Sequence, residues 1–319
     1  MDNTQARRLA RLVAIGVAFI QCGVAGSLFA LDIVTAGNNS STSGTVKSGT
    51  GLVSLDTGTT VFPNGVASAS ASANDTTGVL RVAADFEQSG VSATPLSGAV
   101  GISNIIAAGT FAGPGSGAVP VTVVFDFDAY FSEFSSNVNA TYVVGLTAGI
   151  PGLKKSAGAD FSLMPSLPFK SFVTGDIQTT LPTGEIVTTN NPSPGTITSA
   201  SLANTPGSLA GELTVTLMVT PGQAFGVGAE MSAIVAPEVI PTSTTTGVYS
   251  NAAGVAGING TNTGTIHVIL PAGYSLANVD SPFLAGAVPE PREYLLLLLG
   301  CGVLVTCFGR NGLRRQLAS

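Results

Sequence analysis

Apolar and polar residues alternate one by one along several segments of this chain, and that period constrains the fold more than any other feature. The clearest segments are Val121 to Asp128, Leu213 to Thr220 and Thr265 to Leu270. Successive side chains of a β-strand point to opposite faces, so this alternation predicts half-buried strands. Many of the positions hold β-branched residues, which favour strands.

Weaker strand patterns and turn sequences complete an all-β prediction. Further strands are predicted at Val79 to Phe86, Thr141 to Thr147 and Glu185 to Thr189. Turns are predicted at Pro221-Gly222, Gly260-Thr261-Asn262 and Pro271-Ala272-Gly273. Because no long helical period occurs between residues 40 and 285, we expect an antiparallel β-sandwich, jelly-roll-like in arrangement.

The predicted body spans residues 51–285, as one domain or as two subdomains. Before it, the Ser-, Thr-, Gly- and Asn-rich segment 37–50 is expected to be a flexible leader. The body holds no cysteine, because the three in the chain are Cys22, Cys301 and Cys307. It can form no disulfide, so its stability has to come from strand pairing and a sizeable core.

Charge is scarce and unevenly distributed. Only 9% of the residues are charged, and between residues 31 and 288 five basic and fifteen acidic residues give a net charge of −10. The remaining basic residues lie near the two ends of the chain. With no basic stripe to neutralise phosphates, we expect no nucleic-acid partner.

The N-terminal segment begins with three arginines, Arg7, Arg8 and Arg11. An apolar run from Leu12 to Ala30 follows them. A positive start before an apolar stretch is typical of a secretory signal peptide, which we assign to residues 1–36 with cleavage after Ala30 or after Ala36. The alternative is an uncleaved N-terminal anchor.

The C-terminal segment, residues 286–319, combines a proline-rich motif, an apolar run and a basic end. The motif is Val288-Pro289-Glu290-Pro291, the run is Tyr294 to Phe308, and the basic residues are Arg310, Arg314 and Arg315. The two prolines fix φ and lack amide donors, so Glu290 is expected to be extended and unpaired. The run predicts a transmembrane helix over 294–308, covering roughly 22 Å of a core about 30 Å thick. The arginines would stay in the cytoplasm.

This order of motif, apolar helix and basic end resembles the PEP-CTERM sorting signal of Gram-negative bacteria. The resemblance implies export through the Sec translocon, removal of the signal peptide by signal peptidase, and a transient hold in the inner membrane. It further implies that exosortase, a membrane protease, cuts near Pro289-Glu290-Pro291 and releases the body to the cell surface or an exopolysaccharide matrix. The alternative is an ordinary C-terminal membrane anchor.

Three features are candidate sites of chemistry. Asp56-Thr57-Gly58 matches the motif of aspartic proteases, but no second such motif supplies the other carboxylate, so we interpret it as a strand-end turn. His267 is the only histidine, and no Gly-x-Ser-x-Gly elbow accompanies it. Its strand position predicts a side chain that faces solvent. A lone histidine without cysteine in the body also removes the usual zinc sites.

Asp126, Asp128 and Glu133 are weak candidates for calcium ligands, because carboxylates at period two share a strand face. Their spacing lacks the calcium-loop pattern, so the alternative is a solvated strand face. We therefore expect no cofactor and no enzymatic activity. The predicted function is a non-catalytic structural or adhesive protein of the cell surface or extracellular matrix. The alternatives are a secreted hydrolase or carbohydrate-binding module with a site formed by the fold, and a permanently anchored envelope protein.

Overall fold

The structure of the protein is a computed structural model. It describes residues 31–38, 45–62, 64–89, 98–135, 137–164, 167–181, 183, 185–200, 207–237, 239–243, 248–251, 254–258, 263–286 and 288–289. The expected signal peptide up to Ala30, the helix over 294–308 and the closing arginines lie outside these residues. Within the described ranges, no helix combines the length and the apolar character that a membrane crossing requires.

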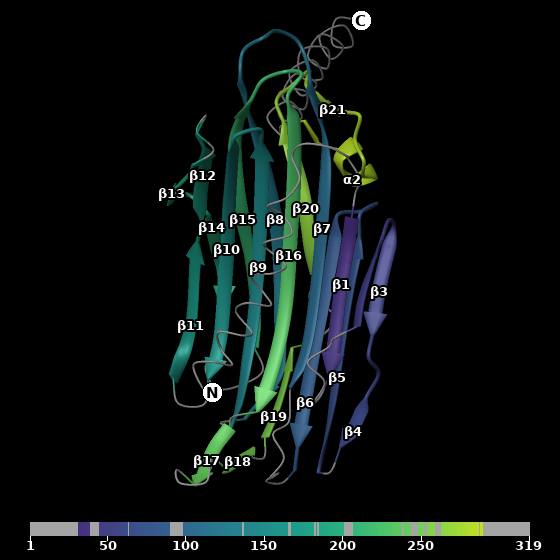
Figure 1. Ribbon diagram of the computed structural model, residues 1–319, viewed down its shortest axis with the longest axis vertical. Coiled ribbons are helices and arrows are strands. Elements are labelled where there is room, and N and C mark those ends of the chain that lie inside the picture. The colour runs from purple at the N-terminus through teal and green to yellow at the C-terminus, as the bar shows by residue number, and fades with distance from the viewer. Residues whose placement is uncertain are drawn as a thin grey trace, which may run out of the picture.

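The described chain is all-β and forms two large antiparallel sheets with strands along the long axis of the molecule (Figure 1). The first, sheet A, has the order β13 (Ile186–Asn190), β12 (Asp176–Thr180), β10 (Leu153–Met164), β9 (Val138–Ile150), β16 (Ala224–Pro237), β7 (Ala99–Ala112), β1 (Leu31–Asn38) and β2 (Thr45–Gly49). Two further strands join it, β11 (Leu167–Thr174) on β10 and β21 (Ser275–Ala277) on β7.

The second, sheet B, is built around β8. Its path is β14 (Gly195–Ala200), β15 (Gly207–Val219), β8 (Val119–Phe134), β19 (Gly254–Ile258), β6 (Val79–Gln88), β20 (Thr263–Leu270) and β22 (Val288–Pro289). On the far side of β6 follow β5 (Gly65–Asn74), β3 (Leu52–Asp56) and β4 (Thr60–Phe62). The short helix α2 (Pro282–Ala285) and the separate pair β17 (Val239–Ser243) and β18 (Val248–Asn251) complete the described elements.

β19 and β20 lie one after the other in the same gap between β8 and β6. The register pairs Ile258 of β19 with Ala84 of β6, and then Thr263 of β20 with Arg81 further along. Both strands also pair with β8 on the other side. This arrangement places β20, and with it His267, beside the acidic positions of β8.

The strands predicted from alternation are confirmed, and they point their apolar residues into the space between the sheets. On β8, Val121, Val123 and Phe125 are 0% exposed. The apolar positions of β15 and of β20 are buried in the same way, from Leu213 to Val219 and from Ile266 to Leu270. Val79 to Phe86, Thr141 to Thr147 and most of Glu185 to Thr189 fall in β6, β9 and β13.

Two of the three predicted turns are also found. Gly222 and Gly273 have φ values of +91° and +79°, a region that glycine enters without steric cost. They follow β15 and β20, where the chain has to reverse. The third predicted turn, over residues 260–262, lies outside the described part.

The two sheets share one apolar core. Tyr142 of β9 is 0% exposed, and its hydroxyl donates a hydrogen bond of 3.1 Å to the backbone carbonyl of Asp128 in β8. This bond therefore joins sheet A to sheet B through the interior. The Phe161 ring of β10 contacts both Tyr142 and Phe127, at centroid distances of 6.2 and 5.8 Å. Burial of each such ring contributes about 1.5–3 kcal/mol.

Part of the segment 37–50, for which a flexible leader is expected, is described as strand. Residues Thr45–Gly49 form β2, which pairs with β1, and β1 pairs in turn with β7 over its whole length from Leu31 to Asn38. β7 offers an edge of backbone donors and acceptors to β1, and β1 offers its own outer edge to β2. A composition rich in Ser, Thr, Gly and Asn is therefore compatible with edge strands here.

Candidate functional site

The outer face of sheet B carries the carboxylates that the sequence singled out. Along β8 the residues that alternate with the core positions, Asp126, Asp128 and Tyr130, are exposed. They are neighboured on one side by β15 and on the other by β20. Three strands thus present their polar side chains on one exposed surface, which we call the β8 face.

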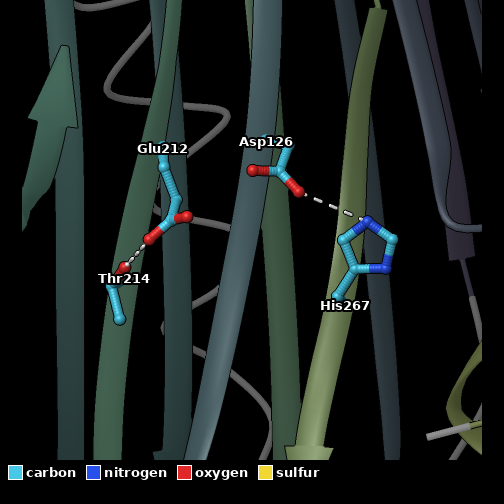
Figure 2. Close-up of polar contacts among 4 residues, drawn as sticks. All are labelled: Asp126, Glu212, Thr214 and His267. Atoms are coloured by element: carbon cyan, nitrogen blue, oxygen red, sulfur yellow. Dashed lines mark hydrogen bonds and ion pairs between the residues drawn. The ribbon is translucent and has the colours of Figure 1, made fainter. Parts of the chain in front are cut away.

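Asp126 lies beside His267 on this face. Their Oδ2 and Nε2 atoms are 3.4 Å apart, and the two side chains are 55% and 49% exposed. Figure 2 shows the carboxylate of β8 and the imidazole of β20 pointing toward each other. His267 thus faces solvent, as predicted, while its neighbours Ile266 and Val268 are buried.

Glu212 approaches Asp126 from the opposite side. The register places it directly across from Asp126 on β15, and its Oε1 accepts a hydrogen bond of 2.8 Å from the Thr214 hydroxyl. The pKa of Asp126 is raised, chiefly by partial burial. The His267 charge lowers that pKa and the Glu212 carboxylate raises it, so Asp126 responds to both neighbouring strands.

Asp128, two residues along the same strand, is held by β20. Its Oδ1 accepts hydrogen bonds from the backbone amide and from the hydroxyl of Thr263, at 2.6 and 2.9 Å. Asp126 and Asp128 therefore engage different partners, although they share a strand face. This carboxylate fixes the start of β20 relative to β8.

The calcium prediction joined Glu133 to these two residues. Glu133 belongs to β8, but its side chain lies outside the described part of the chain. Among the described side chains, no group of three or more His, Cys, Asp or Glu gathers closely enough to hold a metal ion. Calcium binding by Asp126, Asp128 and Glu133 together therefore stays a prediction.

A hollow of about 270 Å³ lies further along sheet B, toward β5 and β6. Its polar lining includes Asp85, Glu87, Ser68 and Ser132. Its floor is Gly257, where an added Cβ would clash with Ser132 Oγ and Asp85 Oδ1. A glycine at this position lets both polar groups lie close to the strand.

A different carboxylate is buried on sheet A. Glu230 of β16 is 8% exposed, and it lies across from Asn104 of β7 and Gly145 of β9. Burial raises its pKa to about 7. Ser232, on the same side of the strand, is fully buried, and its hydroxyl has no hydrogen-bond partner in the described structure.

The Asp56-Thr57-Gly58 motif forms a turn at the end of β3. The Asp56 carboxylate accepts the Gly58 amide at 2.8 Å, and Gly58 has a φ of +58°. The Thr57 hydroxyl accepts the backbone amide of Ala69 at 2.9 Å. The motif thus forms a local Asx turn at the end of β3, and the chain then continues along the same neighbour, β5, as β4.

The sorting motif is described only in part. The backbone of Val288 and Pro289 forms β22, which pairs in parallel with Ile269 and Leu270 of β20. Glu290 and Pro291 lie outside the described residues, as do Arg310, Arg314 and Arg315. The expectation of an extended and unpaired Glu290 therefore stays a prediction.

The sequence identified Asp126, Asp128 and His267 but not the residues that surround them. Glu212, Asp85 and Glu230 were counted only as acids of the body. For Asp85, the sequence did carry a signal: it lies between the apolar residues Ala84 and Phe86, which predicts an exposed side chain on a strand. The pairing of β15 with β8, which brings Glu212 opposite Asp126, joins segments far apart in the chain and has no local signal.

Comparisons of this chain with protein-family models, with curated proteins and with solved structures found no match. The chemistry of the site is therefore the basis for its interpretation. The β8 face offers carboxylates, threonine hydroxyls and one imidazole on a sheet surface. Such groups can accept and donate hydrogen bonds to a polyhydroxylated surface or hold hydrated cations.

Proposed function

We propose that the chain is a non-catalytic, exported structural or adhesive protein of the cell surface or of an exopolysaccharide matrix. The observation that carries this proposal is the β8 face, an exposed surface of carboxylates and hydroxyls suited to hydrogen bonding with sugars. Its acidic groups belong to an exported body with a charge of −10. Charge of one sign keeps such a domain soluble and separate from nucleic acid.

We also propose that Val288-Pro289-Glu290-Pro291, with the helix over 294–308 and the arginines after it, acts as a PEP-CTERM-type sorting signal. Support comes from the order of the three parts at the C-terminal end and from the absence of cysteine in the body. An exosortase-type protease would then act directly after the last strand. A permanently anchored envelope protein is the alternative for this segment.

The register of β1 supports signal cleavage after Ala30 rather than after Ala36. β1 begins at Leu31 and pairs with β7 from Leu31 to Asn38. Cleavage after Ala30 would leave every paired residue of β1 in the mature protein, whereas cleavage after Ala36 would remove most of them. Residue 31 is therefore our proposed mature N-terminus.

Mass spectrometry of the protein recovered from the cell surface tests the route. We expect a first residue of Leu31 and a last residue between Val288 and Pro291. Recovery of peptides from 309–319 in the surface form would contradict release, and recovery of peptides from 1–30 would contradict cleavage. Deletion of the exosortase gene is expected to keep the C-terminal peptides attached.

Pull-down with the producing cell's own purified exopolysaccharide tests the β8 face. We expect Asp126→Asn combined with Glu212→Gln to weaken retention at least about fivefold, since each charged hydrogen bond contributes about 1.5–3 kcal/mol before desolvation. Asp176→Asn, on an exposed strand of sheet A, is the matched control that should bind normally. Equal retention of all three proteins would contradict this assignment of the surface.

A carbohydrate-binding module is the second candidate, and the hollow at Asp85 and Glu87 favours it. This hollow of about 270 Å³, with both polar and apolar residues in its lining, is close to the lower limit for small-ligand sites. Isothermal titration with soluble oligosaccharides of the matrix would decide it: saturable binding that Asp85→Asn removes supports the module. The finer fold proposal, a jelly-roll-like arrangement, is supported by consecutive strands β6, β7, β8 and β9 alternating between the sheets.

A further inference from the structure

The edge strand β13 differs from the other outer strands of the two sheets. All five of its residues are exposed, and they include the apolar side chains Ile186 and Val187, which are 57% and 40% exposed. Within the described residues, β13 pairs only with β12. Its outer edge is thus a strand-length template without a partner in the described part of the chain.

Four other outer strands carry features that block edge-to-edge pairing. β2 contains Lys47, whose ammonium reaches the carbonyl of Ser54 in β3. β14 contains a register shift between Ile197 and Ser199, β11 contains Pro168 and Lys170, and β4 is only three residues long. Lysines, prolines, bulges and short strands are the usual protections of sheet edges. The sequence of β13, IVTTN, has none of them.

The hydrogen-bond pattern of the β12–β13 pair shows which backbone groups face outward. The Leu181 amide donates to the Glu185 carbonyl and the Asn191 amide donates to the Gly175 carbonyl, each at 2.8 Å. The two bonded pairs, Leu181 with Glu185 and Gly175 with Asn191, continue the β12–β13 register at its two ends. In an antiparallel pair, hydrogen-bonded and non-hydrogen-bonded residue pairs alternate.

It follows that Val187 and Thr189 direct their amides and carbonyls toward β12. Ile186, Thr188 and Asn190 direct theirs to the open side. Residues of a strand edge with this pattern can accept one more antiparallel strand without changing the existing ladder.

We propose that β13 is a self-association edge, where a second copy of this chain adds its own β13 in antiparallel orientation. Pairing centred on Thr188 places each Thr188 opposite its counterpart and each Ile186 opposite an Asn190. The five residues of β13 are all uncharged. Just beyond the strand, Glu185 faces Asn191 and not another acid. In a body with a net charge of −10, this neutral strand is a place where two copies meet without direct repulsion.

The geometry makes this contact a closed dimer. A two-fold pairing uses the same edge of both copies, so it leaves no second β13 for further growth. The protected edges β2, β11, β14 and β4 oppose extension into fibres. One short strand pair buries less than the roughly 800 Å² per partner of a standard interface, so we expect a weak dimer with a Kd of about 10 μM to 1 mM. The proposal does not depend on the ligand of the β8 face.

Sedimentation velocity of the full chain in detergent, across this concentration range, tests the dimer. Thr188→Pro removes an outward amide and leaves the β12 ladder intact, so we expect at least a tenfold weaker dimer with an unchanged unfolding midpoint. Thr188→Lys, which places two ammonium groups opposite each other, is a second variant with the same expected loss. Val187→Pro removes an inward amide and should lower the unfolding midpoint instead.

Cross-linking fixes the register. In a background with Cys22, Cys301 and Cys307 replaced by serine, Thr188→Cys is expected to form a disulfide between copies, because opposed Cα atoms lie within disulfide reach. Thr196→Cys on the exposed part of β14 is the matched control and should stay monomeric. A wild-type monomer at 1 mM, dimerisation unaffected by both substitutions at Thr188, equal cross-linking of the control, or growth into polymers would each overturn the proposal.

Discussion

β8 and β16 lie within the interior of the two sheets, and they present opposite kinds of outer face. β8 alternates between buried apolar residues and exposed residues such as Asp126 and Asp128. β16 is buried on nearly every position, including Glu230 and Ser232 on the side away from the core. The two sheets therefore share a core, but their strands treat acidic residues differently: β8 exposes its carboxylates to solvent, whereas β16 buries one.

The largest expected effect is the loss of stability when a core side chain of β8 or of β16 is removed. Phe125→Ala on β8 removes a ring that is 0% exposed and should destabilise the protein by about 3–5 kcal/mol. Met231→Ala on β16, also 0% exposed, should cost about 2–5 kcal/mol. Urea unfolding measures both. A loss below about 1 kcal/mol in either variant would place that strand outside the common core.

The next largest effect is a pH dependence of stability that we expect from the buried Glu230 of β16 but not from the exposed acids of β8. Burial raises the pKa of Glu230 from its ordinary value of 4.5 to about 7, so the folded state binds this proton more tightly than the unfolded state. Its contribution to stability is fully present below about pH 4.5 and is lost as pH rises through 7, by about 3 kcal/mol in all. Glu230→Gln should remove this pH dependence.

Urea unfolding of wild type and Glu230→Gln at about pH 4 and about pH 8 measures the difference. We expect the variant to gain on the wild type by about 3 kcal/mol between the two conditions. Asp126→Asn on β8 is the matched variant. Its unfolding free energy relative to wild type should change much less between the two pH values, because Asp126 is exposed. A similar pH slope in both variants would remove the contrast between the two faces.

A smaller effect concerns the bond that connects the sheets. Tyr142→Phe removes the hydroxyl that donates to the Asp128 carbonyl and should destabilise the protein by about 1–2 kcal/mol. The ring itself stays, so packing against Phe161 is retained. Thermal unfolding measures this loss, and an unchanged midpoint would show that the hydroxyl bond adds no net stability.

The smallest expected effect lies on the β8 face. The Asp126–His267 pair is about half exposed, so His267→Ala should change the unfolding free energy by less than about 1 kcal/mol. It should nevertheless raise the pKa of Asp126, whereas Glu212→Gln should lower it. NMR titration of the Asp126 carboxyl carbon measures both directions. Shifts of the same sign would contradict the arrangement in Figure 2.

Strands with one apolar and one polar face were predictable from the sequence. Strands whose two faces have similar polarity were not. Leu213 to Val219 alternates with threonines, and β15 follows that pattern. β16 has Gly226, Gly228 and Ile234 on its outer side, so its two faces differ little in polarity and its period is hidden. β5 is built from alternating alanine and serine, whose sizes give only a weak signal.

The candidate site was predictable residue by residue but not as an assembly. The position of His267 opposite Ile266 and Val268 already placed its ring in solvent. Its approach to Asp126 depends on the placing of β20 between β8 and β6, and the burial of Glu230 depends on both neighbours of β16. Such long-range pairings are set by packing of the whole sandwich, so single-strand patterns cannot specify them.

The parallel pairing of β22 with β20 has a mechanical consequence. β22 lies on the same side of β20 as β6. The chain of β6 begins after Gly78, whose carbonyl accepts the Ile266 amide, and β22 pairs with β20 just beyond that point. Tension applied from the C-terminal side would therefore load the β22–β20 pair in shear. Shear loads all bonds of a strand pair together, whereas peeling an edge strand breaks them one at a time. A body held through this exit would pass the load to β20, which pairs with both β6 and β8, and not to an outer strand such as β13.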